Sequence, residues 1–188
     1  KIKFFKPIHS KIDDNNNINE IGRSLNLLLD ESAKNRTMGD VPICTMLSGG
    51  IDSVLTTFYV FKNLNFKKIG YQPTSYVFSV KGFDSPDVHK ARLAAKGFKS
   101  INLKLIEVEA SREKIVQEIP KIIETFEMRK IKALSFYPLP IYWYLAPQMK
   151  KDGFKVTIGG HGVDRDGHSP RGHLIVWNIA LIKAVNNP

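Results

Sequence analysis

The sequence contains one cysteine, Cys44, which excludes an intrachain disulfide and a zinc site built from several cysteines. Cys44 stands in an apolar run, and this favours a small buried hydrophobic side chain. No stretch of about 18 uncharged apolar residues occurs, and residues 1–14 lack the apolar segment of a signal peptide. These absences predict a protein without membrane spans that works in the reducing cytoplasm.

Long basic runs are also missing, although the chain of 188 residues carries a formal net charge of +10. That charge favours polyanionic ligands, namely nucleotides, pyrophosphate or nucleic acid. The basic residues are scattered, as in Lys67-Lys68 and Lys150-Lys151, whereas clustering is what indicates a nucleic-acid surface. Solvated lysines around a compact fold are the favoured interpretation, and nucleic-acid binding stays open.

Short apolar runs alternate with helical patterns of 10–15 residues, without internal repeats or a domain linker. This alternation predicts an α/β domain, a parallel sheet of about four to five strands with helices on both faces. Strands are expected over residues 41–47, 75–80, 101–108 and 154–158. Helices are expected over residues 15–35, 53–61, 86–97, 111–127, 140–151 and 173–185.

The first expected helix begins with Asn17 and Glu20 in a capping-box arrangement. Its apolar residues at helical spacing are Ile18, Ile21, Leu25 and Leu28. Ser85 and Pro86 mark the start of the third helix. Pro120 is expected to kink or divide the fourth.

The most specific feature is S-G-G-I-D-S, from Ser48 to Ser53, directly after the first strand. Gly49 and Gly50 permit positive φ and close backbone approach, so that successive N–H groups can converge on one anion. The dipole of the following helix favours phosphate there, and the two serines add hydroxyl donors. Asp52 suits a Mg²⁺ ion shared with phosphates. The motif predicts a pyrophosphate site, the alternative being a tight strand–turn–helix joint.

A second glycine-rich stretch, residues 159–162, follows the last expected strand of the parallel sheet. Ligands of such sheets bind beyond the carboxyl ends of the strands, so the two glycine-rich stretches are expected to meet. The sequence HGVDRDGHSPRGH continues from there, and its histidine spacing is not that of a standard zinc site. It is either an exposed polar loop or a cationic lid over phosphates.

The S-G-G-I-D-S motif resembles the PP-loop of the ATP pyrophosphatase (adenine nucleotide α-hydrolase-like, HUP) superfamily. Within it, MGDVPICTMLSGGIDSVLT and FSVKGFDSPDVHKARLAAKGF are similar to the synthetase domain of asparagine synthetases. IGGHGVDRDG stands where that family has S-G-E-G-x-D-E, and the resemblance runs from about Asn19 to Asp166. It implies one PP-loop domain over residues 1–188, with residues 1–16 as an N-terminal extension and no glutaminase domain.

The resemblance also implies that ATP binds with Mg²⁺ and is cleaved to AMP and pyrophosphate, activating an acceptor for amide-bond formation. Pyrophosphate is expected at Ser48, Gly49, Gly50, Asp52 and Ser53. Adenine is expected beside the backbone of Leu47 and Val80, with Gly159 and Gly160 near the nucleotide. Mg²⁺ is expected at Asp52 and Asp164, and the expected catalytic residues are Asp52, Asp164, His161 and Arg171.

Two residues depart from the family pattern: His161 stands in place of its Glu, and Arg165 in place of its second acid. These changes either strengthen pyrophosphate binding or mark different chemistry. The family's Thr-Thr-x-Arg stretch is not visible, which leaves aspartate as the acceptor open. Expected partners are ATP, a small-molecule acceptor, a separate ammonia donor or glutaminase, and a second copy in a homodimer. The alternatives are an enzyme that modifies a base in tRNA or DNA, and a non-catalytic nucleotide-binding protein.

Overall fold

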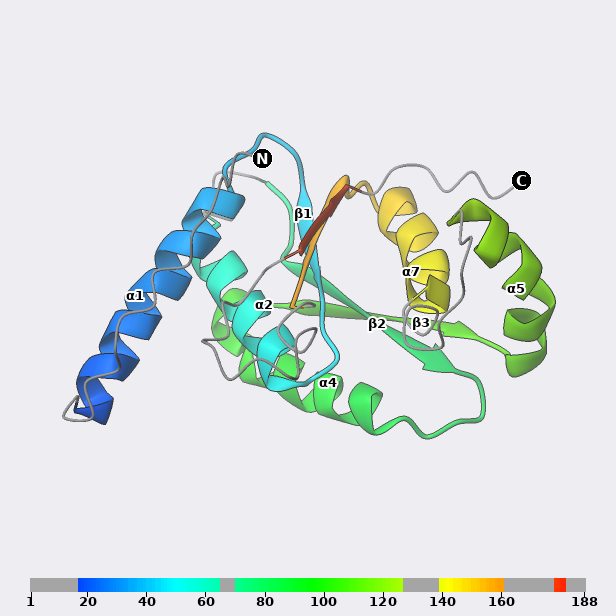
Figure 1. Ribbon diagram of the computed structural model, residues 1–188, viewed down its shortest axis with the longest axis horizontal. Coiled ribbons are helices and arrows are strands. Elements are labelled where there is room, and N and C mark those ends of the chain that lie inside the picture. The colour runs from blue at the N-terminus through cyan, green and yellow to red at the C-terminus, as the bar shows by residue number, and fades with distance from the viewer. Residues whose placement is uncertain (1–16, 65–69, 127–138, 161–177, 182–188) are drawn as a thin grey trace, which may run out of the picture.

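The structure, a computed structural model, describes residues 17–64, 70–126 and 139–160, and the backbone of residues 178–181. The strands form one five-stranded sheet in the order β3-β2-β1-β4-β5 (Figure 1). They are β1 (Ile43–Met46), β2 (Thr74–Val80), β3 (Lys104–Ala110), β4 (Val156–Gly159) and β5 (Asn178–Leu181). The strands β1 to β4 run parallel, which confirms the predicted α/β class, and β5 pairs with β4 antiparallel.

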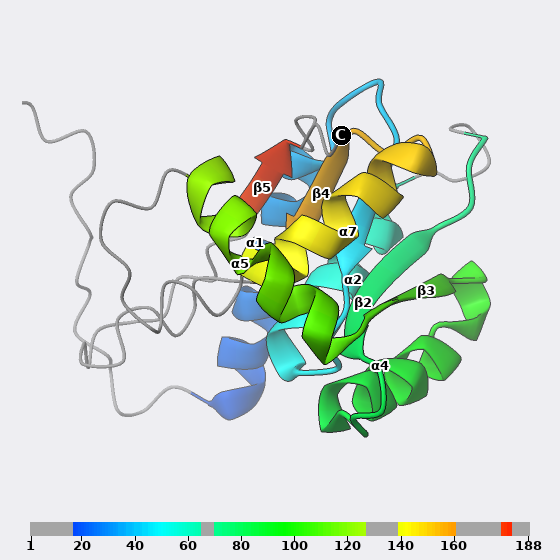
Figure 2. The same ribbon diagram turned by 90° about the vertical axis from the view of Figure 1, so that its right-hand side faces the viewer.

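Helices cover both faces of this sheet, as predicted (Figures 1 and 2). They are α1 (Ile18–Arg36), α2 (Ile51–Asn63), α4 (Pro86–Gly97), α5 (Arg112–Thr125) and α7 (Leu139–Lys151), with a 3₁₀ turn at Lys99–Ile101. On one face α2 and α4 pack on the strands, and α1 packs on α2. On the other face α7 packs on β2 and β3, and α5 packs on α7. None of the described helices is long and apolar enough to cross a membrane.

The central strand β1 sends alternate side chains to the two faces. Ile43 packs with Val60 and Phe61 of α2, whereas Cys44 packs with Met149 of α7. Burial raises the pKa of the Cys44 thiol to about 12, which leaves a neutral, unreactive side chain. Cys44 is thus the small buried hydrophobe that its surroundings in the sequence predict.

Helix α1 forms where the spacing of its apolar residues predicts a helix, but these residues are not the ones that it buries. Leu29 and Ala33 are its buried residues. The four apolar residues at helical spacing are between 48 and 81% exposed: Ile18, Ile21, Leu25 and Leu28. Helical spacing shows which residues share a face but not which face meets the rest of the protein.

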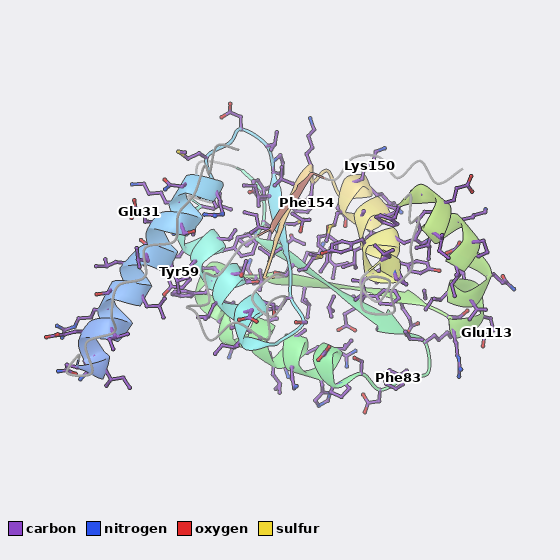
Figure 3. The ribbon with its side chains drawn as sticks, viewed as in Figure 1. Glu31, Tyr59, Phe83, Glu113, Lys150 and Phe154 are labelled. Atoms are coloured by element: carbon purple, nitrogen blue, oxygen red, sulfur yellow. The ribbon has the colours of Figure 1, made fainter. Side chains whose placement is uncertain are left out.

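Polar contacts link α1 to α2 at the margin of their apolar interface. The Tyr59 hydroxyl donates to Asn26 Oδ1 (2.5 Å), and Figure 3 shows Tyr59 between the two helices. Lys62 Nζ lies 2.7 Å from Asp30 Oδ1. At the start of α1, the Asn17 side chain accepts from the Asn19 N–H (3.0 Å), so Asn17 is the N-cap, which is one half of the predicted capping box.

The prediction of a helix over residues 173–185 is wrong for Asn178–Leu181, which form β5. The rest of that range lies outside the described residues. The run HLIVWNIAL is apolar and rich in β-branched residues, and periodicity alone does not separate a buried helix from a strand in such a run. Without β5 the outer edge of β4 would be unpaired. Pairing with β5 satisfies the backbone N–H and C=O groups of that edge.

Prolines inside two helices do not break them. α5 runs undivided through Pro120. Proline has no backbone N–H, so the helical hydrogen bond to the Val116 carbonyl is missing. Pro120 and Val116 are both exposed, so water can satisfy that carbonyl. α7 covers the predicted range of residues 140–151 and contains Pro147.

The aromatic residues of α7 belong to the core rather than to a base-stacking surface. Trp143 is buried, and its Nε1 donates to Glu118 Oε2 of α5 at 3.0 Å. The Tyr144 hydroxyl donates to the same oxygen, while its ring stacks on Phe78 of β2 with centroids 5.4 Å apart. Glu118 therefore ties α5 to α7. The aromatic run from Phe136 to Tyr144 is predicted from its sequence to be core or a subunit interface rather than a base-stacking surface, and its residues 136–138 lie outside the described residues.

Replacing Leu29 by Ala should lower the free energy of unfolding by about 2–4 kcal/mol, because a buried leucine leaves a cavity. The same change at its neighbour Leu28, 64% exposed, should cost no more than about 0.5 kcal/mol. Urea unfolding followed by circular dichroism measures both. Equal losses would mean that the aliphatic face of α1 is the buried one after all.

Candidate functional site

The S-G-G-I-D-S motif forms the turn between β1 and α2. Leu47 is buried, and its N–H donates to the Tyr76 carbonyl of β2 (2.9 Å). Gly50 is the N-cap of α2 and provides no side-chain hydrogen bond to the first turn. The first N–H groups of a helix have no partner within the helix. An anion placed at this end of α2 would find free donors and the positive end of the helix dipole.

Gly49 is held against the backbone of α4. Its φ is +76°, in the left-handed region that glycine adopts without strain. A Cβ atom at this position would lie 2.4 Å from the Lys90 carbonyl carbon and 2.6 Å from the Ala91 nitrogen. A side chain would therefore push α4 away from the turn, so glycine is required here by torsion and by packing.

Gly160, after the end of β4, lies against the first turn of α2. A Cβ atom on Gly160 would lie 2.8 Å from the Asp52 carbonyl carbon and 3.0 Å from the Ser53 nitrogen. Through this contact the end of β4 and the S-G-G-I-D-S motif come together, at Asp52 and Ser53 rather than at Gly49 and Gly50. They meet between β1 and β4, where the strand order reverses, which is the usual ligand position in open α/β sheets.

The two motif serines face one another, with Ser48 Oγ 3.1 Å from Ser53 Oγ. Ser53 Oγ donates to the Gly50 carbonyl (2.9 Å). Because each hydroxyl carries one proton, Ser48 is the donor within the pair. Ser53 is buried and Ser48 is exposed, so Ser48 is the hydroxyl that can turn outward toward a ligand.

Asp52 occupies the first turn of α2 and is partly exposed. Within the described ranges its carboxylate makes no hydrogen bond or ion pair. A carboxylate in this place either interacts favourably with the helix dipole or serves as a ligand for a cation. The part of the chain that the structure describes contains no cluster of three or more His, Cys, Asp or Glu side chains with metal-ligating geometry.

The end of β2 projects beyond β1. Met46 pairs with Tyr76, and residues 77–80 continue paired with β3 alone. Val80 therefore lies at the same edge of the sheet as the turn. Its carbonyl accepts the Phe83 N–H (3.0 Å), so the Leu47 N–H and the Val80 carbonyl are both used within the protein.

Three of the predicted catalytic residues, His161, Asp164 and Arg171, lie outside the described residues, as does Arg165. Their positions remain predictions. The antiparallel register sets Asn178 opposite Gly159, so the chain leaves β4 and enters β5 at the carboxyl edge of the parallel strands.

A chain of buried hydroxyls beneath the turn was not foreseen from the sequence. Thr45 Oγ1 of β1 lies 3.1 Å from Thr57 Oγ1 of α2 and 2.6 Å from Ser75 Oγ of β2. All three residues are fully buried. The available signal was hydroxyl residues within otherwise apolar runs. The chain fixes α2 and β2 relative to β1 just before the turn.

Comparison with known proteins gives one family whose model matches, Asparagine synthase, over residues 24–165. An asparagine synthetase [glutamine-hydrolyzing] from Zea mays is 27% identical over 141 residues, 73% of this chain and 23% of the relative. Asparagine synthetase [glutamine-hydrolyzing] 1 from Bacillus subtilis is 30% identical over 164 residues, 85% of this chain and 22% of the relative. The chain thus spans about a quarter of the length of the curated relatives it matches.

Among solved structures, NMN synthetase from Francisella tularensis is similar with a TM-score of 0.43 and 16% sequence identity. That match covers 81% of this chain and 57% of the solved chain.

Replacing Gly49 by Ala should destabilise the protein by about 2 kcal/mol or more, since the change combines left-handed strain with overlap on α4. The matched change Gly50→Ala should stay within about 0.5 kcal/mol, because φ is −70° there and the added Cβ lies 3.6 Å from Ser48 Oγ. Denaturant titration of both variants is the measurement. A Gly49→Ala variant as stable as the parent would contradict the described packing.

Proposed function

The chain belongs to the asparagine synthase family, and we propose that it binds ATP at the turn from Ser48 to Ser53 and adenylates an acceptor. The observation that carries this proposal is the uncapped start of α2, enclosed by two backbone contacts that only glycine allows. The pyrophosphate part of ATP accepts hydrogen bonds from the free N–H groups of this turn. Ser48 adds a hydroxyl donor once it turns away from Ser53.

The proposed reaction begins with an oxygen of the acceptor, such as a carboxylate, attacking the α-phosphorus of ATP. The bond between the α-phosphorus and the bridging oxygen to the β-phosphate breaks, and pyrophosphate leaves with that electron pair. An amine then attacks the activated carbonyl carbon, AMP departs, and the amine proton passes to solvent or a base. The chain contributes mainly by holding the phosphates in position and stabilising their charge.

The described residues fit a Mg²⁺ ion bound together with ATP. Mg²⁺ is commonly held by one or two carboxylates plus substrate phosphates, and Asp52 offers beside the turn a carboxylate that no other described residue engages. Asp164 is the proposed second ligand. When bound, Mg²⁺ neutralises phosphate charge and assists departure of pyrophosphate. Asp52 itself holds and orients the ion–nucleotide pair.

The proposed product is an amide, with nitrogen from ammonia released by a separate donor or glutaminase. The matched relatives carry the description glutamine-hydrolyzing, which supports glutamine as the source of nitrogen. With His161 and Arg165 in place of two acids, the segment after β4 is more positive in sequence than the family pattern. We therefore propose that the acceptor differs from aspartate, in keeping with the missing Thr-Thr-x-Arg stretch.

A second candidate function keeps ATP and changes the acceptor to a base in tRNA or DNA. The net charge of +10 favours it, because a polynucleotide binds through its phosphates. The scattered positions of the lysines and arginines favour the small-molecule acceptor.

Replacing Asp52 by Asn should reduce Mg²⁺-dependent pyrophosphate release from ATP on the order of 100-fold, because the amide keeps the shape but loses the charge that holds the ion. Glu20→Gln is the control, since Glu20 is the acidic residue in the first turn of α1. It should leave turnover unchanged. Pyrophosphate release is followed with a coupled assay across candidate acceptors, and full turnover by Asp52→Asn would refute the assignment.

Retention on immobilised tRNA distinguishes a small-molecule acceptor from a polynucleotide acceptor. We expect the chain to elute at or below an ionic strength of about 0.15 M, because scattered lysines make few simultaneous phosphate contacts. Retention well above that ionic strength, with competition by free tRNA, would support the polynucleotide acceptor instead.

A further inference from the structure

The turn after β2 holds a large aromatic side chain in solvent beside the candidate site. Val80 to Phe83 form a tight turn closed by the Phe83 N–H and the Val80 carbonyl, with Gly82 at φ +76°. Glycine in that position is the signature of a type II turn. The Phe83 side chain is 64% exposed, and Figure 3 shows it where β2 ends and α4 begins.

Helix α4 connects Phe83 to the turn from Ser48 to Ser53, called the phosphate turn below. Helix α4 begins at Pro86, and its Lys90–Ala91 backbone is the surface that touches Gly49. Lys90 lies about 6 Å along the helix from Pro86 at about 1.5 Å per residue, and the chain from Phe83 to Pro86 adds at most about 10 Å. The backbone of Phe83 is therefore within about 16 Å of the Gly49 contact. An extended nucleoside triphosphate covers a comparable span from its phosphates to its base.

A second apolar side chain is exposed at the start of α2. Ile51 follows Gly50 and is 76% exposed. The two side chains stand among polar groups, which include the Ser48 hydroxyl and the Asp52 carboxylate. Exposed apolar groups beside a polar site suit a ligand that is partly planar and partly anionic.

We infer that Phe83 forms a stacking face for the base of the bound nucleotide. This inference rests on the proposed function and extends it, since it assigns base recognition to a side chain rather than to the backbone of Leu47 and Val80 alone. The turn fixes the backbone of Phe83 before the ligand arrives, so little chain ordering opposes stacking. Asp84 and Lys81 flank the phenylalanine and remain exposed to solvent.

Stacking on a ring face has a characteristic selectivity. Every base has a π-face, so an aromatic platform adds affinity without choosing among bases. Phe83 should therefore raise affinity for ATP relative to a triphosphate without a base. It should not change the ratio of ATP to GTP affinity, which depends on groups at the edges of the base.

The test is isothermal titration of the full chain with ATP, GTP and inorganic tripolyphosphate, each with Mg²⁺. Phe83→Ala should weaken ATP binding about 5- to 150-fold and leave tripolyphosphate binding unchanged. Phe83→Tyr, which keeps the ring, should retain the parent affinity for ATP. Leu93→Ala is the control, because Leu93 lies on α4 and is 61% exposed, close to the value for Phe83.

Several results would overturn the inference. Unchanged ATP affinity in Phe83→Ala would remove the stacking role while leaving the phosphate site intact. An equal loss for ATP and tripolyphosphate would show that the substitution disturbs the phosphate turn instead. If the parent chain binds tripolyphosphate but gains nothing from a base, the stacking face is absent. If the parent binds neither ligand, the proposed function fails together with the inference.

Discussion

Two contacts between backbone segments hold the candidate site together, and both depend on the absence of a side chain. Gly160 lets the end of β4 rest on the first turn of α2, and Gly49 lets the preceding turn rest on α4. A methyl group at either place would overlap backbone atoms, which cannot move without shifting a whole helix or strand. The position of α2 relative to the sheet follows from these contacts.

This arrangement means that the site is formed when the protein folds. The buried hydroxyls of Thr45, Thr57 and Ser75 support the turn from below, and the two glycine contacts fix it from the sides. The conformational entropy of ordering the N–H groups is therefore lost in folding rather than in binding. Such pre-organised donors are what charge stabilisation in phosphate chemistry requires, because they need no rearrangement during the reaction.

The elements could be predicted where local signals agree. Ser85 and Pro86 placed the start of α4, and apolar runs placed four strands to within a few residues. The contact of Gly160 with the first turn of α2, next to the S-G-G turn, accords with the general rule for ligand sites in parallel sheets. The sequence could not indicate that Leu29, rather than Leu28, faces α2, because that choice depends on the partner helix. The strand Asn178–Leu181 was missed for a similar reason, since its conformation is decided by the open edge of β4. The contacts among the Thr45, Thr57 and Ser75 hydroxyls could not be predicted, because they depend on how β1, α2 and β2 pack together.

The aliphatic stripe on α1, Ile18, Ile21, Leu25 and Leu28, has a consequence for how the chain behaves in solution. A stripe of this kind makes contacts between molecules attractive at short range, whereas a net charge of +10 makes them repel at longer range. Added salt screens the repulsion, with a Debye length that falls from about 30 Å at 0.01 M to about 8 Å at 0.15 M, and leaves the attraction in place. The colloidal stability of the chain is thus set by ionic strength, independently of how firmly each molecule is folded.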